Sequence, residues 1–139
     1  MSRFLWTWFL ATVLLVALDA LWLPMVWKSV YKPVYDRIQR KMTFRVWSAA
    51  FTWVLLGLII ALHKGGNGGN AGKGDKGGNH KIYTRGNAFL VGALSGFIVY
   101  GVYNFTNYAT LTHYTLKLSI LDTMWGTLAL GIVSALLLP

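Results

Sequence analysis

The sequence predicts an all-α fold, a polytopic membrane protein in which residues 1–139 form one domain of four transmembrane helices with both termini on the same side. Hydrophobic residues make up 55% of the chain and charged residues only 12%, whereas soluble domains carry about 25% charged residues. Four apolar stretches approach or exceed the ~20 residues that a helix needs to cross the hydrocarbon core. Basic or glycine-rich segments separate the first three of these stretches.

The net charge of +9 is better explained by lipid than by nucleic acid. The basic residues flank apolar stretches, where they face anionic lipid headgroups, and no basic helix or aromatic–basic module accompanies them. The chain has no cysteine, which excludes disulfides, thiolate metal sites and cysteine nucleophiles. His63, His80 and His113 lie in loops or at segment ends, so neither a metal nor a cofactor is predicted.

The first helix is predicted at residues 4–27. The apolar run is too long for a signal-peptide core and has no convincing small-residue cleavage site, so the helix is expected to be retained. Trp6, Trp8 and Trp27 lie near its two ends, as in an aromatic belt. Pro24 has no amide hydrogen and should kink the helix near its exit.

A basic loop is predicted at residues 28–45, where Asp36 is the only acidic residue. Its apolar positions recur at roughly helical spacing, which is typical of a short helix at the membrane interface. A solvated loop is an equally good interpretation. The apolar positions in question are Val30, Tyr31, Val34, Tyr35 and Ile38.

The second helix is predicted at residues 44–62, and a flexible linker at residues 64–81. The linker is rich in glycine and has no apolar side chains to bury, so it cannot offset the entropy of ordering. Its glycines do not form a phosphate-binding loop, because no strand precedes them and GKG is not followed by Ser or Thr.

The third and fourth helices are predicted at residues 88–107 and 117–138. The third contains Gly92 and Gly96, a GxxxG motif that lets another helix approach closely. Gly126 and Gly131 offer the same possibility in the fourth helix. Four spans place both termini and the linker on one side, side A, and the loops 28–45 and around His113 on side B. Basic residues are denser near the helix ends on side B, which favours a cytoplasmic side B.

Polar residues interrupt the apolar stretches at similar depth. At ~1.5 Å per residue, Asp19 lies about 12 Å and Asp122 about 6 Å in from the side B ends of their helices. Asn104 and Asn107 lie near the same boundary. Because polar groups are costly inside a membrane, they mark either a helix-packing contact or a functional site.

Two Asp-x-x-Trp motifs place an acid and an indole on one helix face in each of two antiparallel spans. If these spans are neighbours, Trp125 could donate to Asp19, and Trp22 could donate to Asp122. The third helix adds two polar stripes. We therefore predict a cluster that packs helices or binds an ion or polar solute, made of Asp19, Trp22, Tyr100, Tyr103, Asn104, Thr106, Asn107, Asp122 and Trp125.

The stretches YGVYNFTNYATL (100–111) and LSILDTMWGT (118–127) resemble the signature of a small membrane-protein family catalogued as domain of unknown function 2177. Its members look like four-helix proteins with an early Asp-x-x-Trp-Leu, matched by Asp19, Trp22 and Leu23, and a late YxxYDxTNxAT…DxxWG pattern. The chain departs from this pattern at Asn104, where the family usually has Asp, and in the glycine-rich linker. The resemblance implies the four-helix fold and brings no activity, substrate or cofactor.

Four classes of function are open for this multi-pass integral membrane protein, and the least favoured is a tryptophan-rich ligand-binding receptor, because most of the seven Trp suit interface anchors. The cluster is the packing core of a scaffold or partner subunit, or it lines a small oligomeric transporter or channel for protons, cations or a polar solute. A lipid-acting enzyme is less favoured, because there is no HExxH motif and no intramembrane nucleophile with its base. The expected partners are the lipid bilayer, anionic headgroups at the basic loops, and a second copy or another membrane protein.

Overall fold

The computed structural model describes residues 2–39, 41, 43, 45–68 and 84–139. In these residues all regular secondary structure is helical. The elements are α1 (Arg3–Val26), the π-helical turn η1 (Trp27–Tyr31), α2 (Lys32–Ile38), α3 (Val46–Gly68), α4 (Arg85–Thr110) and α5 (Leu116–Leu137). Four helical stretches are long and apolar enough to cross a membrane: Arg3–Ile38, Val46–Lys64, Arg85–Thr110 and Leu116–Leu137. The predicted all-α membrane fold is confirmed.

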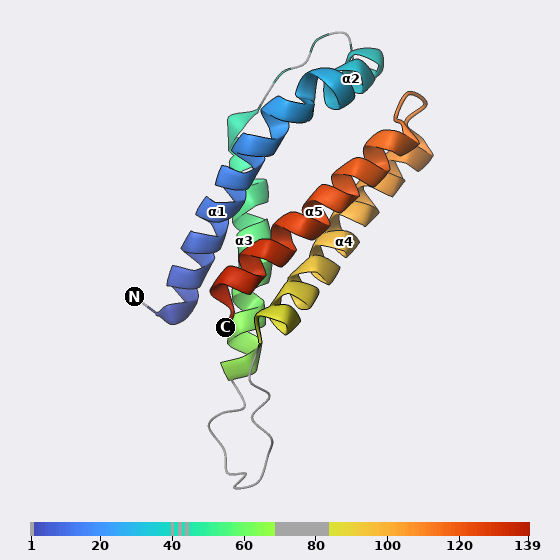
Figure 1. Cartoon of the computed structure of the whole chain (residues 1–139). Coiled ribbons are helices and arrows are strands. Elements are labelled where there is room, and N and C mark those ends of the chain that lie inside the picture. The colour runs from blue at the N-terminus through green and yellow to red at the C-terminus, as the bar shows by residue number, and fades with distance from the viewer. Residues whose placement is uncertain (1, 40, 42, 44, 69–83) are drawn as a thin grey trace, which may run out of the picture.

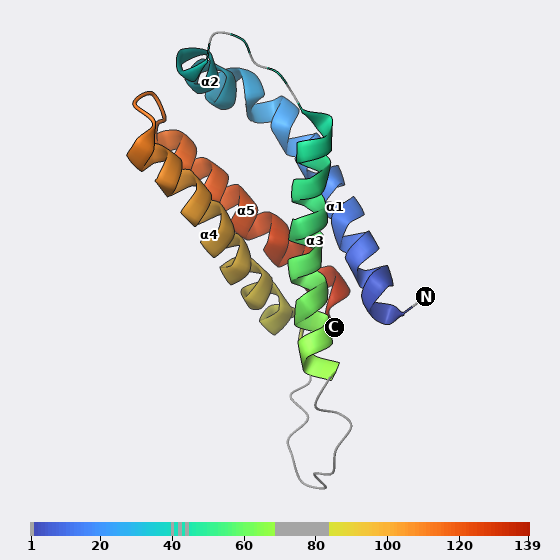
Figure 2. The same cartoon turned by 180° about the vertical axis from the view of Figure 1, so that it is seen from behind.

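The helices are arranged as two antiparallel pairs that α5 joins (Figure 1). α1 packs along α3, and α4 packs along α5, while α5 also contacts α1 and α3. Figures 1 and 2 show both termini at one end of the molecule, with α2 and the α4–α5 turn at the other. The end with the termini corresponds to the predicted side A, and the other end corresponds to side B.

The helix that begins with α1 continues into the predicted basic segment at residues 28–45. Of the two interpretations of that segment, the helix is therefore correct for residues 28–38 and the loop is wrong there. The backbone N–H of Lys32 donates to the carbonyl of Trp27, five residues earlier, which is the π-helical pattern. Pro24 lies just before this turn. In both views the chain turns from α1 toward the α4–α5 end (Figures 1 and 2).

The reason for this helical extension is a buried apolar face. Tyr31 and Val34 pack with Tyr114 and Leu118 at the side B end of α5, and all four side chains are buried. A solvated loop would leave these groups in contact with water, so burial favours the helical alternative.

α3 begins at Val46 and continues to Gly68, so the predicted linker at residues 64–81 is wrong for residues 64–68. Residues 69–81 of that linker lie outside the described residues, as does Phe44, the predicted start of the helix. A helix that is already formed gains one backbone hydrogen bond for each added residue, which opposes the cost of glycine. The Lys64 ammonium also donates to the carbonyl oxygen of Leu137 at 2.6 Å.

The last two helices begin at side-chain caps. The Thr84 hydroxyl accepts from the Asn87 amide at 3.2 Å, and the Thr115 hydroxyl accepts from the Leu118 amide at 3.2 Å. Such caps satisfy N–H groups that have no partner within the helix. The first cap starts α4 at Arg85, before the predicted residue 88, and α4 ends at Thr110, beyond the predicted residue 107.

Small residues let α4 and α5 approach closely. A Cβ atom at Gly96 would lie 2.2 Å from the Gly126 carbonyl oxygen, and one at Gly92 would lie 2.4 Å from the Leu130 carbonyl oxygen. No side chain fits at these distances, so the two glycines of the GxxxG motif allow the backbones to meet. The prediction of close packing at this motif is confirmed.

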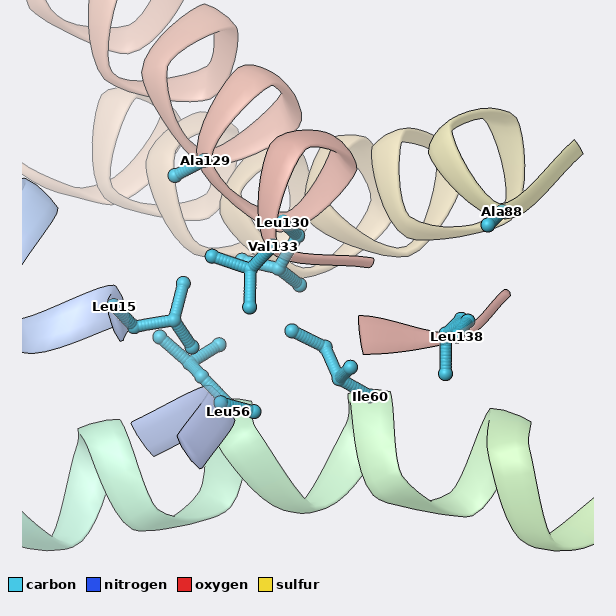
Figure 3. Packing of buried hydrophobic residues seen from close by; sticks show 9 residues of the cluster. Leu15, Leu56, Ile60, Ala88, Ala129, Leu130, Val133 and Leu138 are labelled. Carbon is cyan, nitrogen blue, oxygen red and sulfur yellow. The ribbon is translucent and has the colours of Figure 1, made fainter. Parts of the chain in front are cut away.

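The main apolar core lies where α1, α3 and α5 meet (Figure 3). Leu15, Leu56 and Val133 come from the three helices and are at most 5% exposed. Asp19 follows Leu15 along α1, and Asp122 lies between Leu118 and this core along α5. The two acids therefore lie between the main core and the smaller apolar cluster at side B.

Candidate functional site

Asp19 on α1 accepts two hydrogen bonds from other helices. The indole N–H groups of Trp53 on α3 and Trp125 on α5 each lie 2.7 Å from a different carboxylate oxygen. An indole N–H only donates, so both bonds use the carboxylate as acceptor. Asp19 thus joins three helices, and the predicted contact between Trp125 and Asp19 is confirmed.

Asp122 on α5 is held in the same way by two other segments. The Tyr31 hydroxyl of η1 donates to one carboxylate oxygen, and the Asn104 amide of α4 donates to the other at 2.7 Å. Asp122 therefore connects α4, α5 and η1.

The predicted hydrogen bond from Trp22 to Asp122 is wrong. The Trp22 indole N–H donates instead to the Tyr31 hydroxyl, at 3.4 Å, and that hydroxyl donates to Asp122. The π-helical turn carries Tyr31 into the place expected for Trp22. The Trp22 ring stacks on Trp125, with 4.6 Å between the ring centroids and 2° between the planes.

Asn104 is fully buried, at 0% exposure. Both the nitrogen and the oxygen of its side-chain amide make hydrogen bonds. Its Nδ2 also donates to the Tyr100 carbonyl at 2.9 Å, and its Oδ1 accepts from the Tyr114 hydroxyl at 2.6 Å. Burial raises the pKa of Tyr114, which lies in the turn between α4 and α5. The phenol therefore stays protonated and acts as a donor.

These contacts form one continuous row, which we call the polar network. Hydrogen bonds make every link except one, the ring stacking of Trp125 on Trp22. The row reaches from α3 to the α4–α5 turn at side B. In order, its members are Trp53, Asp19, Trp125, Trp22, Tyr31, Asp122, Asn104 and Tyr114.

Neither acid of the polar network has a basic partner among the described residues. The one salt bridge found there joins Lys32 to Asp36 on the surface of α2. The same part of the chain contains no group of three His, Cys, Asp or Glu residues that could hold a metal ion. The carboxyl groups of Asp19 and Asp122 are therefore paired with hydrogen-bond donors and not with basic side chains.

The predicted site residues fall into two groups. Five belong to the polar network through their side chains: Asp19, Trp22, Asn104, Asp122 and Trp125. Tyr100 contributes its backbone carbonyl, and a Cβ atom at Gly126 would lie 2.1 Å from its ring. Tyr103 and Thr106 are exposed. Asn107 is half-buried, and its side chain lies within hydrogen-bonding reach of Tyr114. At 100° per residue, positions 103 and 106 point away when Asn104 faces α5.

Sequence analysis missed three members of the polar network. Trp53 lies in the middle of its span, away from the membrane interfaces where Trp anchors are usually found. This position could have indicated that its indole N–H has a partner inside the protein. Tyr31 was recognised only as part of an apolar stripe. Tyr114 lies in a turn, and no local pattern shows that the turn folds back onto Asn104.

Residues 77–138 match the model of a family described as "Predicted membrane protein (DUF2177)". Over these residues the chain is similar to that family. The match covers α4 and α5, with Asn104, Asp122 and Trp125, and it confirms the resemblance seen there. The early Asp19-x-x-Trp22 motif lies before the matched residues. No curated protein and no solved structure matches the chain.

Removing the Tyr31 hydroxyl should weaken the polar network without changing its apolar packing. We expect Tyr31→Phe to lower the free energy of unfolding by about 1 kcal/mol, because Asp122 and Trp22 each lose a partner. Titration with SDS from mixed micelles, followed by circular dichroism, measures this. Tyr108→Phe is the control, since Tyr108 is 45% exposed. Equal losses in the two variants would contradict a special role for Tyr31.

Proposed function

We propose that this protein is a membrane scaffold or partner subunit, and that the polar network is its helix-packing core. One observation carries the proposal: each carboxylate oxygen of Asp19 and Asp122 accepts a hydrogen bond from a side chain on another segment. Together the two acids link all four spans. Because an unsatisfied polar group is costly in hydrocarbon, satisfied groups of this kind hold helices together.

The outer surface of α4 is consistent with a partner subunit. α4 packs mainly against α5, which leaves its other face apolar and exposed. Leu90, Leu94 and Val102 are each at least 60% exposed. A face of this composition suits lipid, and it also suits a helix of another membrane protein or of a second copy.

Transport of protons or cations is the second candidate, and a specific observation favours it. Asp19 and Asp122 have no basic partner among the described residues, and they lie in one row that reaches the side B turn at Tyr114. Intramembrane carboxylates of this kind serve as relays in transporters. Asn104→Asp, which restores the usual family residue, should increase ion binding only if the site binds ions. The lipid-acting enzyme has no comparable support, because the chain has no HExxH motif and the described residues hold no group of three His, Cys, Asp or Glu that could bind a metal ion.

The two candidates differ in what Asp19→Asn does. The asparagine NH2 group would face one of the two indole N–H donors, so one hydrogen bond is lost. We expect the free energy of unfolding to fall by about 1–2 kcal/mol, with the variant still folded at low detergent stress. In proteoliposomes, wild type should show no flux of protons or monovalent cations under an imposed gradient.

Asp36→Asn is the matched control for this experiment. Asp36 is an exposed partner of Lys32, so the same substitution there should change stability little. A flux in wild type that vanishes in folded Asp19→Asn or Asp122→Asn would overturn the scaffold proposal and establish transport. A folded Asp19→Asn variant with wild-type stability would also contradict the packing role.

A further inference from the structure

The helical extension formed by η1 and α2 has two chemically different faces. Tyr31 and Val34 are 6% exposed and pack on the start of α5 and the turn before it. Lys28, Lys32 and Arg37 are exposed. An amphipathic helix with a basic outer face is typical of segments that lie at a membrane surface.

In the described part of the chain, more basic residues lie at this end of the molecule than at the end with the termini. Among the described residues, Asp36 is the only acid there, and it pairs with Lys32. The other basic side chains have no carboxylate within salt-bridge distance in the described part of the chain, so anions from outside must balance their charge. The exposed basic residues at this end, which we call the basic face, are Lys28, Lys32, Arg37, Lys41, Arg45 and Lys117.

The basic face lies at the depth of the lipid headgroups. α1 alone, Arg3–Val26, has 24 residues, or about 36 Å at 1.5 Å per residue, against ~30 Å of hydrocarbon. η1 and α2, which follow it, therefore lie near the membrane boundary. Trp27 stacks with Tyr31 at 6.2 Å and with Tyr35 at 6.4 Å between ring centroids. Trp and Tyr are enriched at headgroup level, which supports this placement.

We propose that the basic face binds the phosphate headgroups of anionic membrane lipids. Lysine and arginine stems can lie along the apolar boundary while their charged ends reach the phosphates. Several basic residues beside a membrane helix bind anionic lipids by summed electrostatic attraction. Because the opposite face of the same extension carries Tyr31, bound lipid would also hold Tyr31 on Asp122.

Electron spin resonance of spin-labelled lipids tests this proposal on the full chain in phosphatidylcholine bilayers. The measured quantity is the association constant of spin-labelled phosphatidylglycerol relative to spin-labelled phosphatidylcholine. We expect wild type to prefer phosphatidylglycerol, and Lys28→Gln/Arg37→Gln to lose at least about fivefold of that preference at low salt, as expected from the loss of basic residues near the surface. The preference should fall with added salt, because salt screens exposed charges.

The control variant is Arg3→Gln/Arg85→Gln, which removes the same charge from exposed residues near the side A ends of α1 and α4. It should keep the preference, as should Lys28→Arg/Arg37→Lys, which retains both charges on the basic face. Equal affinity of wild type for the two lipids would overturn the proposal. So would an unchanged preference in Lys28→Gln/Arg37→Gln, or an equal loss in the side A control.

Discussion

Gly96→Ala should separate α4 from α5 and lower the free energy of unfolding by about 3 kcal/mol. The new methyl group would lie 2.2 Å from the Gly126 carbonyl oxygen and 3.0 Å from the Thr127 Cα. Both are backbone atoms, so no rotamer change can make room, and the helices themselves must move. Overpacking of this kind typically costs about 1–3 kcal/mol. A clash with backbone atoms should cost an amount near the upper end of this range, because the backbone cannot move aside as a side chain can.

The same substitution at Gly101 is a matched control on the same helix. A Cβ atom there would lie 3.8 Å from the Thr123 side chain, which is ordinary contact. Gly101→Ala should therefore leave stability within about 0.5 kcal/mol of wild type, or raise it slightly, because alanine favours helix over glycine. Equilibrium unfolding in SDS mixed micelles measures both variants. A Gly96→Ala variant as stable as Gly101→Ala would show that the close approach does not hold the hairpin together.

The sequence was sufficient to predict the features that depend on composition and local spacing. Long apolar runs determine where helices cross a membrane, and the GxxxG motif needs only a four-residue spacing, so Gly92 and Gly96 could be interpreted from sequence alone. The contact between Trp125 and Asp19 was also predictable, because two antiparallel Asp-x-x-Trp motifs place these groups at the same depth.

The remaining features depend on tertiary packing that no short pattern encodes. The π-helical turn adds a residue to the helical register after Pro24, and so it is Tyr31, in place of Trp22, that meets Asp122. Helical spacing assumes an ordinary α-helix, so it placed Tyr31 only among the apolar positions of a short helix at the membrane interface. Tyr114 reaches Asn104 only because the α4–α5 turn folds back. The extension of α3 to Gly68 was missed because glycine content was given more weight than helix propagation.

Asn104→Ala should be the most damaging change within the polar network. It removes the donor to Asp122 and the acceptor for Tyr114 at once, and it leaves a space at a site that is 0% exposed. Stranded buried polar groups cost about 1–3 kcal/mol each, so we expect the free energy of unfolding to fall by about 2–4 kcal/mol. Asn87→Ala, on the same helix, is the control, because Asn87 is exposed and no described hydrogen bond includes its side chain.

A double-mutant cycle with Tyr114→Phe separates the hydrogen bond from the cavity. If Asn104 and Tyr114 act through their 2.6 Å bond, the Tyr114→Phe loss should nearly disappear once Asn104 is alanine, giving a coupling energy of about 1 kcal/mol. Strict additivity would mean that the two residues contribute through packing alone. The cycle therefore tests whether hydrogen bonding links the α4–α5 turn to the buried acid, as both the scaffold and the transport candidates require.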